Sequence, residues 1–180
     1  MSVIHKHLSE VSEGMTLLDK GEVEQMIACL RVIRKNGGTV YLFGNGGSHA
    51  TASHFANDLI KMCRTRAVCI GDMASAMLAY GNDNGWLFMF SHPLQKMLRK
   101  GDGVIGISCS GDSENVLNAL DSAVGNSFIS IGLTGNSELS RINKLDLHAL
   151  VHARYPDIRV QEDLHMMVCH AVARSLQELD

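Results

Sequence analysis

Two short segments rich in glycine, serine and asparagine have the composition of anion-binding loops. The first is Gly44-Asn45-Gly46-Gly47-Ser48, and the second is Ser108-Cys109-Ser110-Gly111-Asp112-Ser113. Each follows a short apolar run and precedes a helical pattern, so serine hydroxyls and the free N–H groups of a helix start could surround one phosphate. Neither segment contains lysine or arginine. Neutral donors and helix dipoles would therefore hold the anion.

Histidines and carboxylates on two other helical patterns could bind a metal or move protons. His54 and Asp58 are four residues apart, so they share one face of a helix and can reach one ion. Glu162 and His170 are eight residues apart, a rise of about 12 Å on a regular helix. That rise is too long for both to bind one ion from one straight helix. Either the helix start is irregular, or two subunits contribute, or only one of the two binds metal.

Plainer interpretations compete with each of these sites. A Gly/Ser turn between a strand and a helix is often only a tight connection, although two such turns in one small chain strengthen the case for binding. The first segment lacks the lysine of a P-loop and the glycine spacing of dinucleotide sites, which disfavours nucleotides. His49 could line the pocket, and His165 could support the site from behind. We interpret the remaining histidines as structural or solvated: His5, His7, His92, His148 and His152.

The segments that would position these side chains alternate between strand and helix patterns. Short apolar runs predict strands at 39–44, 67–70, 103–108 and 128–133, with a possible fifth at 145–151. Apolar periodicity predicts two helices within 3–35 and further helices near 49–62, 73–80, 87–99, 114–124 and 160–178. This alternation predicts an α/β fold, a three-layer doubly wound sandwich with a five-stranded parallel sheet and an N-terminal helical extension. Ligands of such sheets bind at the carboxyl ends of the strands.

Composition narrows the class of protein further. The chain has 180 residues, enough for one well-buried domain, 1–180, with 46% hydrophobic and 19% charged residues. Its net charge of −3 gives no basic surface for nucleic acid or an anionic membrane. No apolar run approaches the roughly 20 residues of a membrane span, and the N-terminal segment lacks a signal-like apolar region. Five cysteines without CxxC spacing suit buried thiols in a reducing cytoplasm. We therefore expect a cytoplasmic protein.

Four sequence segments resemble a known family. GNGGSHATASHFANDL and SCSGDSENVLNAL resemble the SIS (sugar isomerase) family, and residues 54–59 and 162–170 resemble its phosphoheptose isomerase branch. The resemblance extends from about residue 39 to the end of the chain. It implies a flavodoxin-like fold and an aldose–ketose isomerisation of sedoheptulose 7-phosphate through an enediol, in lipopolysaccharide heptose biosynthesis. It also implies a homotetramer, in which residues 1–36 would serve oligomerisation, and it allows one zinc ion per site.

The resemblance also implies a role for individual residues. It assigns Asp58 as the catalytic base and His170 as its acid/base partner. The implied metal ligands are His54, Asp58, Glu162 and His170. The implied substrate- and phosphate-binding residues are Asn45, Gly46, Gly47, Ser48, Asn82, Asp83, Ser108, Ser110 and Ser113.

This chain departs from the family pattern at three positions. Asp58 stands where the family usually has glutamate, Glu162 where it usually has glutamine, and Cys109 where serine or threonine is common. The shorter base could weaken proton abstraction, and the extra carboxylate would change the metal affinity. A non-catalytic phosphosugar-binding regulator, or an SIS protein that binds a replication initiator, is the alternative. The histidine and carboxylate set favours the enzyme, because a sensor has no need of it.

Overall fold

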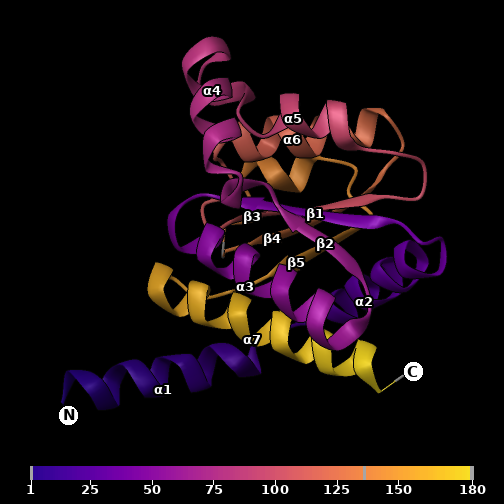
Figure 1. Cartoon of the computed structure of the whole chain (residues 1–180). Helices are drawn as coiled ribbons and strands as arrows, with labels where there is room; N and C mark the ends of the chain where they lie inside the picture. The colour runs from indigo at the N-terminus through magenta and orange to yellow at the C-terminus, as the bar shows by residue number, and fades with distance from the viewer. Residues whose placement is uncertain (1, 136, 179–180) are drawn as a thin grey trace.

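Five parallel strands form one sheet in a computed structural model that describes residues 2–135 and 137–178 (Figure 1). The strands are β1 Thr39–Gly44, β2 Arg66–Cys69, β3 Gly103–Ser108, β4 Ile129–Thr134 and β5 Ala149–His152. Their order in the sheet is β2-β1-β3-β4-β5. After β1 the chain forms β2 on one side of that strand, and it then crosses over to form β3 on the other side. This reversal places the carboxyl ends of β1 and β3 next to each other, which is the usual ligand position in such sheets.

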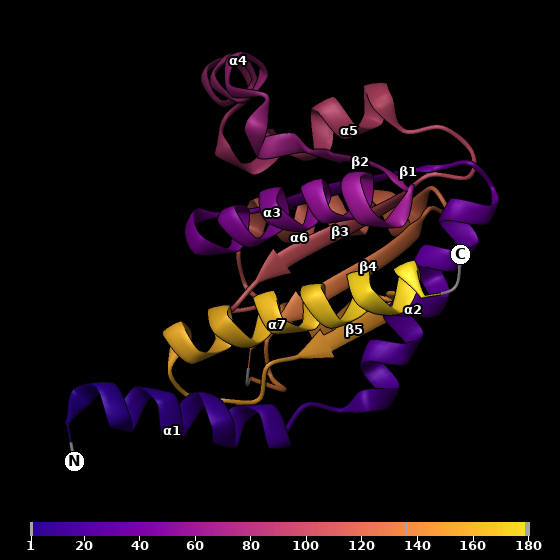
Figure 2. The same ribbon diagram turned by 60° about the horizontal axis from the view of Figure 1, so that its bottom comes forward.

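Helices cover both faces of the sheet (Figures 1 and 2). The helices are α1 Val3–Thr16, α2 Lys20–Lys35, α3 Gly46–Cys63, α4 Ala74–Asn84, α5 Ser91–Met97, α6 Glu114–Gly125 and α7 Ile158–Gln177. Short 3-10 turns are η1 Ile70–Asp72, η2 Trp86–Phe88 and η3 Arg141–Lys144. Helices α2, α3 and α7 pack on one face, and α5 and α6 pack on the other with part of α4. None of the helices in the described ranges has the length and apolar character to cross a membrane.

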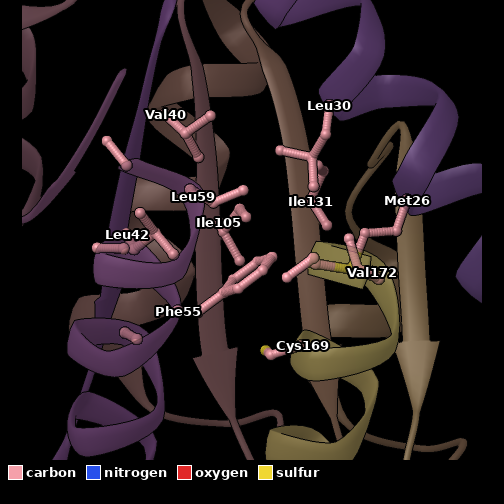
Figure 3. Close-up of a cluster of buried hydrophobic side chains, with 14 of the residues drawn as sticks. Met26, Leu30, Val40, Leu42, Phe55, Leu59, Ile105, Ile131, Cys169 and Val172 are labelled. Carbon is pink, nitrogen blue, oxygen red and sulfur yellow. The ribbon is translucent and has the colours of Figure 1, made fainter. Parts of the chain in front are cut away.

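The strands are buried on both faces, which explains why they read as continuous apolar runs. Along β1, Val40 and Leu42 face the layer of α2, α3 and α7, whereas Tyr41 and Phe43 face the opposite layer. In Figure 3 the ring of Phe55 points from α3 into the space between the sheet and α7. The core on this face therefore determines how α3 and α7 lie relative to each other.

The two N-terminal helices have different environments. Helix α2 buries Met26, Leu30 and Ile33 completely, so it is part of the helical layer. Helix α1 packs along α7, where Gly14 lies against Leu164, and most of its remaining surface is exposed. Only α1 is therefore an extension of the three-layer core.

Side chains of α2 bond to backbone groups of β5 and the segment just before it. The Glu22 carboxylate accepts a hydrogen bond from the His152 N–H at 2.9 Å, and the Gln25 amide donates to the His148 carbonyl at 2.7 Å. Arg154 donates to the same Glu22 carboxylate at 2.6 Å. These bonds fasten α2 to the sheet through polar groups as well as through its apolar face.

The predicted fold is confirmed, and the differences are local. The helix predicted at 87–99 is divided into η2 and α5. The strand predicted at 145–151 is only 149–152, because Leu145 ends the turn η3 and packs with Leu147 against the other layer. Helix α3 begins at Gly46, so most of the first glycine-rich segment forms the first turn of a helix.

Candidate active site

A pocket of about 300 Å³ lies where β1 and β3 end. Helix α3 begins at its edge, so the backbone N–H groups of the first helical turn lie beside it. Gly46 has a φ of +55°, a conformation that favours glycine at this turn. The residues that line the pocket are Asn45, Gly46, Gly47, Ser48, Ile107, Ser108, Cys109, Ser110, Ser113, Ile158 and Glu162. Both glycine- and serine-rich segments therefore meet in one pocket, as their positions after adjacent strands require.

The serines of the second segment form a small hydroxyl cluster. Ser108 Oγ lies 3.0 Å from Ser113 Oγ and 3.3 Å from Ser110 Oγ. The Gly111 N–H donates to Ser108 Oγ at 3.2 Å, and Gly111 has a φ of +67°. A Cβ at Gly111 would also collide with Ser140. Both the positive φ and the lack of space therefore favour glycine at this position. Three hydroxyls and the start of α3 give the pocket the neutral donors that an anion needs.

A carboxylate also lies in this pocket. The Glu162 side chain comes from α7 and lies against Gly47, where an added Cβ would collide with it. Glu162 is half-buried, and no cationic side chain is among the pocket-lining residues. The pocket therefore combines positive potential from a helix start with one built-in negative charge.

Three of the predicted metal ligands meet in a second cluster, between α3 and α7. His54 Nε2 lies 3.4 Å from Asp58 Oδ2, and His170 Nε2 lies 3.8 Å from the same oxygen. The two Nε2 atoms are 3.1 Å apart, so at most one of them can carry a proton that points at the other. The histidine side chains are about half exposed, whereas that of Asp58 is 5% exposed. One face of the cluster is thus open to solvent.

The Asp58 carboxylate is incompletely satisfied. Its Oδ2 atom is buried and accepts no hydrogen bond within the described residues. Buried carboxylate oxygens normally have a hydrogen-bond partner, and one without a partner indicates a catalytic role or an ion-binding role. Two imidazoles and a carboxylate are also a common ligand set for zinc. The donor atoms of these three residues all lie within 4.8 Å of one another, so the cluster fits a metal ion.

Helix α7 separates Glu162 from this cluster. The helix runs from Ile158 to Gln177, with Asp157 as its N-cap, so Glu162 and His170 lie on the same continuous helix. An irregular helix start therefore does not bring them together. Within one chain, Glu162 belongs to the pocket and His170 to the cluster with Asp58.

Two other predicted substrate residues lie away from the pocket lining. Asn82 and Asp83 are exposed on α4, where the Asn82 amide donates to the Asp83 carboxylate at 2.8 Å. Helix α4 projects from the sheet in both views (Figures 1 and 2). His49 also lies outside the pocket lining, and its ring contacts Cys69 and Asp72 instead.

The sequence of residues 5–135 matches the SIS domain family. The protein named "Phosphoheptose isomerase 1" of Campylobacter jejuni subsp. jejuni is 34% identical over 179 residues, which cover 97% of this chain and 93% of that protein. The chain belongs to the phosphoheptose isomerase family.

Solved structures agree with this assignment and confirm the predicted resemblance. The phosphoheptose isomerase GmhA of Neisseria gonorrhoeae has a TM-score of 0.89 at 29% identity, and the match covers 96% of this chain and 97% of that one. A phosphoheptose isomerase of Francisella tularensis has a TM-score of 0.85 at 25% identity, with 97% and 94% covered.

In this member of the phosphoheptose isomerase family, Asn115 joins the two pocket loops, a role that the sequence analysis did not assign to it. Buried Asn115 exchanges two hydrogen bonds with Asn45, at 2.9 and 3.0 Å. The bonds connect the start of α3 to the start of α6, on which Asn115 lies. Asn115 comes just two residues after the serine-rich segment, but its partner is seventy positions away, so local spacing did not indicate its role.

His165 supports the second loop from behind. Its ring is buried, and its Nε2 atom lies 2.8 Å from the Thr134 carbonyl, to which it donates. Burial lowers the pKa of His165 to about 4, so the ring is neutral near pH 7 and its Nδ1 atom can accept a hydrogen bond. Cys109 Sγ lies 3.8 Å from that atom, and burial raises the pKa of the Cys109 thiol. The thiol is thus a protonated, buried part of the loop's support.

Proposed function

We propose that this chain isomerises sedoheptulose 7-phosphate to an aldose heptose 7-phosphate through an enediol. The observation that carries the proposal is the convergence of Asp58, His54 and His170, from two helices, on one half-open cluster. The relatives that match nearly the whole chain are named phosphoheptose isomerases. A protein that only senses a phosphosugar has no use for a buried carboxylate without a hydrogen bond beside two histidines.

Each part of the site has a separate task in this proposal. The hydroxyls of Ser48, Ser108, Ser110 and Ser113 hold the phosphate together with the start of α3. The unpaired Oδ2 atom of Asp58 removes the proton from carbon, which is the difficult step of an enolisation. His170 transfers protons to and from the sugar oxygens, because its ring is exposed and lies beside Asp58.

We also propose that the cluster can bind a zinc ion through His54, Asp58 and His170. This is an alternative to the metal-free proton transfer described above, because one side-chain atom cannot bind the metal and carry the proton at once. When bound, the metal would stabilise negative charge on the sugar oxygens. The open face of the cluster leaves room for substrate, as a catalytic rather than a structural zinc site requires. Glu162 would join this ligand set only if a second subunit brought it to the cluster.

Exchange of carbon-bound hydrogen with solvent tests the proposed reaction. The purified chain is incubated in deuterated water with sedoheptulose 7-phosphate, with and without zinc, and followed by NMR. Deuterium should enter the substrate at the carbon from which Asp58 removes the proton, and aldose should accumulate. Tight binding of the sugar phosphate without exchange would instead establish a non-catalytic phosphosugar-binding regulator.

We propose that the chain works in the cytoplasm as a homotetramer. Apolar side chains are exposed on α1, including Val3, Ile4 and Leu8. An apolar groove of about 400 Å³ lies between α1, α2 and α7, lined in part by Met15 and Met167. A second chain packed on these surfaces would remove them from water.

Assembly gives a direct prediction. Light scattering should report a mass near four times the 19.6 kDa of one chain. Leu8→Glu places a charge on the exposed apolar face of α1 and should shift the population toward smaller species. Ser9→Glu, which places the same charge on an exposed polar position of α1, is the matched control and should leave the mass unchanged. A stable monomer of the unaltered chain at micromolar concentration would contradict the proposal.

Glu162 provides a second prediction. Because its carboxylate repels a phosphate in the same pocket, Glu162→Gln should strengthen binding of inorganic phosphate by about 1 kcal/mol, roughly fivefold. Calorimetry measures the change. Ser110→Ala, which removes a donor from the same pocket, should change affinity in the opposite direction. Equal affinities of the unaltered chain and Glu162→Gln would show that the carboxylate lies away from the bound anion.

A further inference from the structure

A second group of side chains that can ligate metal lies beside the pocket, at the end of β2. His49 is on the first turn of α3, Cys69 is the last residue of β2, and Asp72 is in η1. Cys69 Sγ lies 3.5 Å from His49 Nδ1, and His49 Nε2 lies 3.4 Å from Asp72 Oδ1. One ligand atom from each residue lies within 4.8 Å of the others.

The separation between Cys69 Sγ and His49 Nδ1 is that of two ligand atoms in a tetrahedral transition-metal site. Bonds of about 2.3 Å to sulfur and about 2.0 Å to nitrogen or oxygen place tetrahedral ligand atoms roughly 3.3–3.6 Å apart. One ion uses only one nitrogen of His49. If it binds Nδ1, beside Cys69, a rotation of the half-exposed Asp72 side chain completes the three ligands. Thiolate, imidazole and carboxylate together suit zinc or cobalt better than magnesium or calcium.

Neighbouring residues determine where the side chains of His49 and Asp72 lie. The ring of His49 lies directly over Gly71, where any side chain would collide with it. Ser53 donates to Asp72 Oδ2 at 2.7 Å, which leaves the other carboxylate oxygen toward His49. This hydrogen bond holds the Asp72 carboxylate beside His49, and the rotation that brings the carboxylate to an ion at Nδ1 would release it. Cys69 is buried, whereas His49 and Asp72 are partly exposed, so an ion can enter from solvent.

The same three residues could suggest a nucleophilic cysteine activated by histidine and aspartate. Burial and the nearby Asp72 charge raise the pKa of Cys69 to about 11, however, so the free thiol is protonated near pH 7. A reactive cysteine needs a lowered pKa and access to substrate. Metal ligation needs neither, because the ion itself displaces the thiol proton.

We propose that His49, Cys69 and Asp72 bind one divalent transition metal of the zinc class. The site is distinct from the His54–Asp58–His170 cluster and does not depend on the proposed isomerase activity. His49 and His54 are five residues apart on α3, which places them about 140° apart around the helix. An ion here would join the end of β2 to the first turn of α3. Its fourth position would be open to water.

Cobalt(II) tests the site with a signal that is independent of activity. Cobalt bound to a thiolate has a near-ultraviolet charge-transfer band, which histidine and carboxylate ligands alone do not give. The full-length chain is treated with a chelator, reduced and titrated with cobalt. The band should appear in the unaltered chain and in Asp58→Asn/His170→Ala, which lacks two ligands of the other cluster. It should also appear in Cys29→Ser, a matched cysteine control.

Substitutions of the three proposed ligands test whether these residues bind the cobalt ion. Cys69→Ser should abolish the band, and His49→Ala and Asp72→Asn should each weaken cobalt affinity by about tenfold or more. Asp72 is half exposed, so Asp72→Asn is expected to fold even if the buried Cys69→Ser does not, and circular dichroism checks both. The proposal is overturned if no band forms in the unaltered chain, or if the band persists in folded Cys69→Ser. A band that is unaffected by both His49→Ala and Asp72→Asn would also overturn it.

Discussion

Replacing Asp58 by asparagine should lower turnover of sedoheptulose 7-phosphate by about 100-fold or more, the usual scale for loss of an acid/base group. Asparagine has nearly the same shape, but its amide cannot accept a proton from carbon. Because Asp58 Oδ2 accepts no hydrogen bond, the substitution removes a base without breaking a hydrogen-bond network. His170→Ala should cause a loss of similar size, because in the proposed mechanism His170 transfers protons to and from the sugar oxygens. Both changes are measured as initial rates at saturating substrate.

The effect of Asp58→Asn is compared with that of the same substitution at a position far from the cluster. Asp121→Asn makes the same chemical change at an exposed position of α6, on the opposite face of the sheet, and should leave turnover unchanged. Phosphate binding should also survive in Asp58→Asn, since the pocket lies apart from the cluster. Full turnover in Asp58→Asn would eliminate Asp58 as the base. Lost phosphate binding would show instead that the variant disturbs the fold.

Phe55→Ala should lower the free energy of unfolding by about 3–5 kcal/mol, a large effect for one substitution. Phe55 has no exposed surface, and its ring fills space between α3, the sheet and α7 (Figure 3). The neighbouring backbone cannot close a cavity of that size, because α3 and α7 both rest on the sheet. Urea unfolding followed by circular dichroism measures the loss.

A surface residue of the same helix is the matched control for Phe55. Ile60 is 56% exposed, so Ile60→Ala should change stability by only about 0.5 kcal/mol or less. Phe55→Leu keeps most of the buried volume and should lie between the two. A loss below about 1 kcal/mol in Phe55→Ala would mean that the helices close over the space. Turnover should then fall, because His170 would move relative to Asp58.

The strands and the His54–Asp58 pair could be predicted because their signals are local. Buried parallel strands give short apolar runs, and a spacing of four places two side chains on one helical face. The approach of His170 to Asp58 depends on how α3 packs against α7, which no local spacing encodes. The position of Glu162 in the pocket where β1 and β3 end has the same origin. It follows from the angle of α7 over the sheet and from the absence of a side chain at Gly47.

The bonds between α2 and β5 have a consequence for how copies of this chain can associate. An edge strand exposes unpaired N–H and carbonyl groups that can recruit a strand from another molecule. At the β5 edge, Glu22 and Gln25 already occupy the His152 N–H and the His148 carbonyl. Both edge strands, β2 and β5, are also only four residues long. The sheet is therefore protected against edge-to-edge extension and the aggregation that follows from it, which leaves helical surfaces for any closed assembly.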